Sequence, residues 1–235
     1  MITLFIPTLN EIEGVKKILP QIKKEWVDEI LIIDGNSTDG TREWLTENGY
    51  PFVTQKRKGG VGAWWDAFEL AKGDIIIPFS PDGNSRVEAI TYLVDMMSIN
   101  DMVIASRYKD GGKSEDDDFL SALANRFFNK LINFLFKTNY TDALVMYKGF
   151  RKDLLKKLNI TENTGMRFNP WRASMFELII SLRASNLKVL EIPSSEPLRV
   201  DGTKDSRAHP NKLAKIYNGF LMLGIIFYEF IHMRG

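Results

Sequence analysis

The sequence predicts an α/β fold with a mostly parallel sheet flanked by helices. Three observations support this prediction. Short apolar runs alternate with stretches of helical periodicity over the first hundred residues, and turn-forming Asp, Asn, Ser and Gly residues follow the runs. The chain of 235 residues is 44% hydrophobic, so it can bury a substantial core. This length suits one large domain, or one domain with a smaller appendage.

Five apolar runs in the first part are the expected strands, and each is bounded by Pro, Gly or clustered turn formers. They cover residues 2–6, 29–33, 51–55, 74–79 and 101–106. The segments between them carry apolar residues at helical spacing. The expected helices cover residues 13–24, 41–48, 61–71 and 87–98.

The second half continues the domain and ends in an apolar segment. Residues 110–118 form a polar, acidic loop, and strands are expected just before residue 150 and at 188–192. Helices are expected at 119–136, 151–158, 175–185 and 213–233. The last of these is short for a membrane span, which needs about 20 apolar residues, and it contains Glu229. It can pack on the domain or on a second subunit, lie in a membrane interface, or span the membrane.

Composition excludes several classes of protein. With 31 basic and 30 acidic residues, the net charge of +1 does not support bulk binding of nucleic acid. The absence of cysteine excludes disulfides, thiolate metal sites and cysteine nucleophiles. The N-terminus lacks the basic and apolar regions of a signal peptide. We therefore expect a cytoplasmic protein, at the inner face of the membrane if the last helix contacts lipid.

Three polar loops follow predicted strands and should meet at one edge of the sheet, where open α/β proteins bind ligands. Their sequences are PTLNE (7–11), DGNS (34–37) and SPDGN (80–84). In the third loop, Asp82 is either one ligand of a metal–diphosphate site or only a turn residue. A fourth segment, KRKGGVGA (56–63), places basic residues and glycines at a helix start, which suits phosphate.

Together these segments resemble the family-two glycosyltransferases of the GT-A fold. The motifs are IPTLNE, IIDGNSTDGT, KGGVGAWWDAFELAKGDIII and ASRY, in this order. Among the branches of the family, the chain most resembles the dolichol- and polyprenol-phosphate sugar transferases. The resemblance is dense over residues 1–108, which would form the nucleotide-sugar-binding core. Residues 109–210 would form an acceptor-side region of the same domain, and 211–235 a C-terminal helix.

The resemblance implies roles for individual residues. A metal ion, Mg²⁺ or Mn²⁺, would be held by Asp82 and Asn84, with Ser80 in the place of a further aspartate. Asp142 and Glu177 are the candidate catalytic carboxylates. Further residues would bind the nucleoside-diphosphate sugar together with Asp82: Pro7, Asn10, Glu11, Asp34, Lys58, Gly60, Gly62, Arg199 and Lys204.

The resemblance also implies an inverting, metal-dependent transfer of a sugar to a polyprenyl phosphate or to a surface glycan. The acidic residues 116–118 would repel a phosphate acceptor unless they form a solvated face. Two other classes stay open. One is a non-catalytic or weakly active nucleotide-binding module, because Ser80 replaces an acidic ligand; the other is a nucleotidyltransferase.

Overall fold

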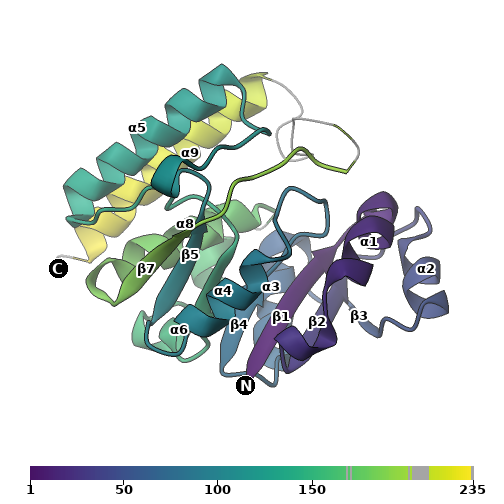
Figure 1. Cartoon of the computed structure of the whole chain (residues 1–235). Coiled ribbons are helices and arrows are strands. Elements are labelled where there is room, and N and C mark those ends of the chain that lie inside the picture. Colours follow the sequence, from purple (N-terminus) through teal and green to yellow (C-terminus); the bar gives the residue numbers. More distant parts are fainter. Residues whose placement is uncertain (168, 170, 201, 203–211, 234–235) are drawn as a thin grey trace.

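A seven-stranded sheet forms the centre of the protein in the computed structural model (Figure 1). The structure describes residues 1–167, 169, 171–200, 202 and 212–233. The strand order is β3-β2-β1-β4-β6-β5-β7, and β6 alone runs antiparallel to its neighbours. The predicted α/β class with a mostly parallel sheet is confirmed. The strands are β1 (Ile2–Thr8), β2 (Glu29–Asp34), β3 (Phe52–Thr54), β4 (Ile75–Pro78), β5 (Met102–Ser106), β6 (Lys148–Arg151) and β7 (Val189–Pro193).

Helices cover both faces of this sheet. Their bounds are α1 (Ile12–Ile18), α2 (Thr41–Glu47), α3 (Gly59–Leu70), α4 (Ala89–Met96), α5 (Phe119–Phe136), α6 (Leu154–Lys157), α7 (Glu162–Met166), α8 (Ala173–Arg183) and α9 (Lys212–His232). The helix predicted at 13–24 is shorter than expected, because the chain tightens into a 3-10 turn at Leu19–Gln21 that contains Pro20. The short helix α7 was not predicted.

The strands β1, β2, β4 and β5 are mostly buried on both faces, which explains their almost continuous apolar sequences. In β1, Leu4 and Ile6 belong to the core that includes α1 and α4, whereas Phe5 belongs to the core that includes α3 and α8. The same alternation holds in β4, where Ile76 and Ile77 enter opposite cores. The segment 109–200 contributes β6 and β7 to this same sheet.

The helices α5 and α9 lie side by side at the periphery, beyond the sheet (Figure 1). Phe136 of α5 and Phe230 of α9 stack edge to face, with their ring centroids 5.9 Å apart. Glu229 is buried and receives two hydrogen bonds from Arg183 of α8, at 2.7 and 2.9 Å. One face of α9 therefore packs on the domain, although the helix is long and apolar enough to cross a membrane.

Candidate active site

The carboxyl ends of the parallel strands form one edge of the sheet, at the upper side of Figure 1. Thr8 at the end of β1 lies in register with Asp34 at the end of β2. The strand β4, which leads to Asp82, pairs with β1 on its other side. The three polar loops therefore lie next to one another, as the strand order requires.

Asp34 is fully buried at this edge and holds the loop after β2 together. Its Oδ2 accepts hydrogen bonds from the hydroxyls of Thr8 at 3.0 Å and Ser37 at 2.6 Å. Its Oδ1 accepts the backbone N–H of Ser37 at 2.9 Å, and the guanidinium of Arg42 lies 3.6 Å away. In this arrangement Asp34 shapes the loop, and its contact with a nucleoside stays a prediction.

Asn10 connects the loops that follow β1 and β2. Its backbone is left-handed, with φ of 55°, and its N–H donates to the hydroxyl of Ser37 at 2.8 Å. Its side-chain oxygen accepts the backbone N–H of Thr38 at 2.8 Å. Pro7, in β1, and Glu11, which is half-buried, lie on either side of this connection. The predicted nucleoside-binding residues are thus close together, and their contact with a ligand stays a prediction.

The glycines at the start of α3 are required by packing. A β-carbon on Gly60 would lie 2.9 Å from the backbone nitrogen of Ala173, and one on Gly62 would lie 2.7 Å from the carbonyl carbon of Arg57. Close packing against protein backbone therefore explains why both positions are glycine, and their contact with a nucleotide stays a prediction. Lys58 is exposed just before the helix, and its contact with a phosphate stays a prediction.

Asp82 lies in the turn after β4 and is paired with the guanidinium of Arg199. Its Oδ2 accepts a hydrogen bond from Nη1 of Arg199, and its Oδ1 accepts the backbone N–H of Asn84 at 3.2 Å. The backbone N–H of Val200 donates to the carbonyl oxygen of Asp82 at 2.8 Å. The segment that carries Arg199 thus folds back over the turn that carries Asp82. Lys204 lies outside the described residues.

A second carboxylate on Arg199 comes from the acidic loop before α5. Nη2 of Arg199 donates to Oδ2 of Asp116 at 3.2 Å. The next residue, Asp117, accepts hydrogen bonds from the hydroxyl of Tyr108 and from the amide of Asn125. Burial raises the pKa of Asp116, and Arg199 opposes this shift. These two aspartates do not form a solvated face, because Asp116 pairs with Arg199 and Asp117 accepts hydrogen bonds from Tyr108 and Asn125. The guanidinium of Arg199 balances the charge of Asp116, so Asp116 does not present an uncompensated charge that would repel a phosphate.

The oxygen atoms around Asp82 fit a hard divalent cation that also binds a substrate phosphate. Asp82 supplies a carboxylate, Asn84 can supply an amide oxygen, and a guanidinium already balances the charge of Asp82. In the part of the chain that the structure describes, no group of three or more His, Asp or Glu residues is placed to hold an ion. Such a site suits Mg²⁺ or Mn²⁺ bound together with a diphosphate.

Asp142 has no exposed surface and is not placed as a catalytic base. Its carboxylate accepts two hydrogen bonds from the guanidinium of Arg107, at 2.7 and 2.9 Å, and one from the Arg107 backbone N–H at 3.0 Å. Burial would lower the pKa of Arg107, but Asp142 and Glu196 raise it well above its ordinary value. The prediction of a base is therefore corrected: Asp142 fixes the residue that follows β5.

Glu177 lies in the core, behind the sheet, and the prediction that it is catalytic is also corrected. It is 2% exposed, and its Oε1 accepts the indole N–H of Trp64 at 3.1 Å. The buried ammonium of Lys148 donates to the hydroxyl of Ser181 at 2.7 Å and lies close enough to Glu177 to affect its ionisation. Burial raises the pKa of Glu177 and lowers the pKa of Lys148. Both side chains are buried, so neither is exposed to a ligand at the carboxyl edge.

Sequence reasoning did not assign roles to Arg107, Lys148 and Asp116. Arg107 was visible within the ASRY motif, and Asp116 within the acidic loop. Their partners lie 35 and 83 residues away along the chain, so no local pattern could have identified these pairs.

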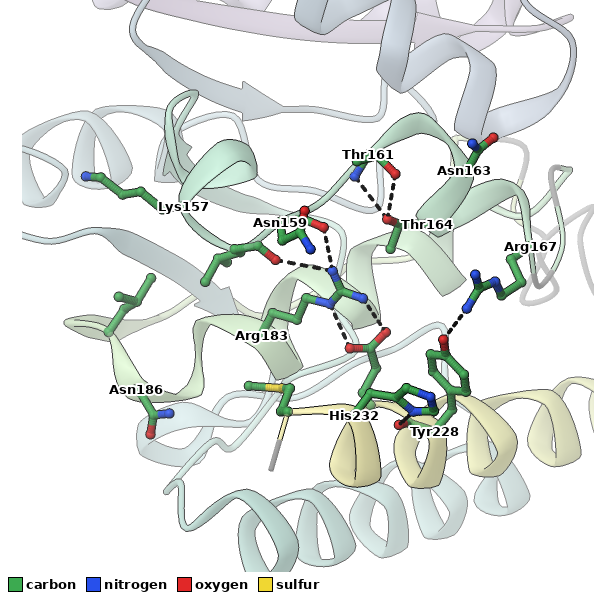
Figure 2. Close-up of a pocket in the computed structure, with 14 residues that line it drawn as sticks. Lys157, Asn159, Thr161, Asn163, Thr164, Arg167, Arg183, Asn186, Tyr228 and His232 are labelled. Carbon is green, nitrogen blue, oxygen red and sulfur yellow. Dashed lines mark hydrogen bonds and ion pairs between the residues drawn. The ribbon is translucent and has the colours of Figure 1, made fainter. Parts of the chain in front are cut away.

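A hollow of about 620 Å³ lies at the opposite, amino edge of the sheet (Figure 2). It is lined by residues between the end of α6 and the start of β7, and by residues at the C-terminal end of α9. Arg183 donates to the carbonyl oxygen of Asn159 at 2.8 Å and to the carboxylate of Glu229. Dashed lines at Arg183 in Figure 2 mark its contacts. The guanidinium of Arg167 donates to the hydroxyl of Tyr228. These contacts join α9 to the domain, at the end of the sheet away from Asp82.

Residues 3–159 match the family model described as Glycosyl transferase family 2. The chain belongs to this family. It is therefore a glycosyltransferase, and the resemblance that the motifs suggested is confirmed. The family match also decides against the nucleotidyltransferase alternative.

Relatives of the chain include transferases that act on polyprenyl phosphates. Glycosyltransferase AglJ of Haloferax volcanii is 26% identical over 97% of this chain and 70% of its own length. The undecaprenyl-phosphate mannosyltransferase of Micrococcus luteus is 23% identical over 80% of each chain. The dolichol-phosphate mannosyltransferase of Pyrococcus furiosus is 30% identical over 53% of this chain and 38% of its own.

A solved structure shares the fold. Glucosyl-3-phosphoglycerate synthase from Mycobacterium tuberculosis, in complex with Mn²⁺, UDP and glucosyl-3-phosphoglycerate, aligns with a TM-score of 0.63 at 18% identity. The alignment covers 97% of this chain and 79% of the other. The GT-A fold predicted from the motifs is confirmed, and the crystal structure of this neighbour contains Mn²⁺ together with UDP.

Proposed function

We propose that this glycosyltransferase moves a sugar from a nucleoside diphosphate to a polyprenyl phosphate at a membrane surface. The transfer is inverting and uses Mg²⁺ or Mn²⁺. The contact between Asp82 and Arg199 at the carboxyl edge carries this proposal. It joins a carboxylate that can bind a metal to a guanidinium that can bind a phosphate, and the two residues come from loops 117 residues apart.

The donor would bind along the loops after β1, β2 and β4. Asn10, Glu11 and Asp34 supply polar groups where β1 and β2 end. Asp82 and Asn84 would hold the cation, which stabilises the negative charge that grows on the departing diphosphate. Arg199 would bind the same diphosphate through its guanidinium nitrogens.

The burial of the candidate bases favours a phosphate acceptor. A sugar hydroxyl needs a base to remove its proton, whereas a phosphate is already ionised at neutral pH. Asp142 and Glu177 are both buried and engaged. An oxygen of the acceptor phosphate attacks the anomeric carbon, and the bond from that carbon to the diphosphate oxygen breaks. The nucleoside diphosphate leaves with the bonding electrons, and the anomeric configuration is inverted.

An apolar ridge on α5 and α9 supports action at a membrane. The residues of the ridge are apolar and exposed: Phe119, Leu120, Leu123, Phe127 and Phe134 on α5, and Leu213, Ile216, Tyr217, Phe220, Phe227 and Ile231 on α9. On α5, exposed Arg126 and Lys130 lie among them. Cations beside aromatic side chains suit an anionic lipid surface. We place the enzyme on the cytoplasmic side of this surface, where donor and lipid acceptor meet.

The proposed chemistry can be tested by calorimetric titration of UDP, GDP, CDP and dTDP, with and without Mn²⁺. We expect one nucleotide to bind in a Mn²⁺-dependent manner to the wild type and to Asp95→Asn, an exposed control, but weakly to Asp82→Asn. The matching nucleotide sugar should then glycosylate polyprenyl phosphate in vesicles, with an inverted anomeric centre by NMR. Nucleotide binding without transfer would support the binding-module alternative, and unchanged binding by Asp82→Asn would refute the metal site.

The membrane surface can be tested by sedimentation with vesicles of phosphatidylcholine and phosphatidylglycerol. Phe127→Ser combined with Phe220→Ser should reduce binding strongly. Tyr92→Ser removes an equally exposed aromatic side chain from α4 and should leave binding unchanged. If the wild type does not sediment with vesicles and is a dimer by light scattering, the ridge is a subunit interface instead.

A further inference from the structure

One guanidinium holds two carboxylates at the proposed metal site. Nη1 of Arg199 donates to Asp82, and Nη2 donates to Asp116 at 3.2 Å. The side chains of the two aspartates are only 11% and 12% exposed. Two carboxylates in such a setting need a positive charge nearby. The guanidinium supplies it in this structure, and a divalent cation would meet the same need.

We propose that Asp116 is the second carboxylate ligand of the cation, and that Arg199 takes the place of the cation while no donor is bound. By resemblance to the polyprenol-phosphate branch of the family, Ser80 stands in the place of a further aspartate. A carboxylate from another loop would supply the missing ligand. This inference rests on the proposed function, since it assumes that a nucleoside diphosphate binds together with a metal ion.

Two buried atoms in this cluster lack hydrogen-bond partners among the residues that the structure describes. They are Oδ1 of Asp116 and Nε of Arg199. Buried polar atoms in native proteins are nearly always bonded, so such exceptions point to an ion or to a second state of the site. With a cation between the carboxylates, Oδ1 of Asp116 would gain a partner. Arg199 would be free to place all its donors on a diphosphate.

The loop with Asp116 is fixed to the segment with Arg199. Ser114 forms a parallel β-bridge with Glu196. The N–H of Glu115 donates to the carbonyl oxygen of Glu196 at 2.8 Å, and the N–H of Glu196 donates to the carbonyl oxygen of Lys113 at 2.9 Å. Asp116 therefore lies two residues after Ser114, and Arg199 lies three residues after Glu196. Backbone pairing between the two segments therefore holds Asp116 close to Arg199.

The arrangement couples the metal to the donor. A cation that binds alone must displace the guanidinium from both carboxylates, so its affinity is low. A diphosphate offers the guanidinium a new anionic partner and leaves the carboxylates to the cation. Each ligand should therefore raise the affinity for the other by the same factor.

Electron paramagnetic resonance of Mn²⁺, alone and with UDP or GDP added in turn, tests this coupling. We expect Arg199→Gln to bind Mn²⁺ alone more tightly than the wild type, and to show less gain on adding nucleotide. Asp116→Asn should bind Mn²⁺ at least about tenfold more weakly than the wild type. Loss of a residue that only supports a metal ligand already costs about tenfold or more in affinity, and loss of a ligand itself should cost no less. Glu115→Gln makes the same charge change on an exposed neighbour and should have no effect.

Two results would overturn the inference. One is an unchanged affinity of Arg199→Gln for Mn²⁺ alone, a measurement that does not depend on the folding of Asp116→Asn. The other is an Asp116→Asn variant that binds Mn²⁺ like Glu115→Gln, while Asp82→Asn has lost the ion; the proposed function would then stand without Asp116. If Asp82→Asn also binds Mn²⁺ normally, the metal site of the proposed function itself is refuted.

Discussion

Asn in place of Asp142 distinguishes a catalytic carboxylate from a structural one. If Asp142 were a general base, its replacement by Asn would lower turnover and leave the stability of the protein unchanged. The structure instead predicts a loss of stability, because Asp142 is fully buried and receives three hydrogen bonds from Arg107. In the variant, the amide NH₂ would face guanidinium donors, and the charge of Arg107 would lose its main partner.

The expected cost follows from the geometry of this pair. Removing one partner of a buried ion pair costs about 3 to 5 kcal/mol. We expect about 3 kcal/mol for Asp142→Asn, at the lower end of that range, because the carboxylate of Glu196 still lies 3.5 Å from Arg107. For a chain of this size, the melting temperature should fall by about 6 to 12 °C.

Urea denaturation and thermal melting of Asp142→Asn measure this loss of stability, with Asp153→Asn as the control variant. Asp153 also forms an ion pair, with Lys157 at 2.9 Å, but both side chains are more than half exposed. This control should therefore lose no more than about 0.5 kcal/mol. An Asp142→Asn variant that melts like the control and loses at least about a hundredfold in turnover, as expected when a general base is removed, would refute our reasoning and restore Asp142 as the base.

Two other buried features give further predictions. Lys148→Met should lower the unfolding free energy in urea by about 3 kcal/mol. Adding Glu177→Gln should recover much of this loss, since neither charge of this pair is then left buried without the other; no recovery would show that the two charges do not interact. Burial lowers the pKa of Lys148 from 10.5 to about 8. The unfolded chain therefore binds this proton more tightly, and wild-type stability should rise from about pH 8 toward pH 10. Above that, the raised pKa values of Tyr108, Tyr140 and Tyr147 oppose the rise. The double variant should lack this rise. Gly62→Ala should cost about 2 kcal/mol through overpacking against Arg57. In α9, a β-carbon on Gly224 would meet nothing within 4 Å, so Gly224→Ala should raise the unfolding free energy by up to about 1 kcal/mol. If the two variants have the same melting temperature, both predictions are contradicted.

Local patterns predicted most elements of the fold. The helix α5 begins and ends at the predicted residues, and the five strands of the first part lie within two residues of their expected bounds. The strand β6 was expected, but its antiparallel position between β4 and β5 was not. Strand order depends on which apolar faces pack together, and a single strand carries no record of its neighbours.

By itself, the sequence determined the family, the fold class and the sheet edge where polar loops meet, because motifs and periodicity are local properties. Tertiary structure alone decided the roles of the individual carboxylates. Asp82 and Asp116 face one guanidinium at the carboxyl edge, whereas Asp142 and Glu177 are buried. The chemistry of a carboxylate depends on its burial and on the charges beside it. Here those charges come from residues far away along the chain.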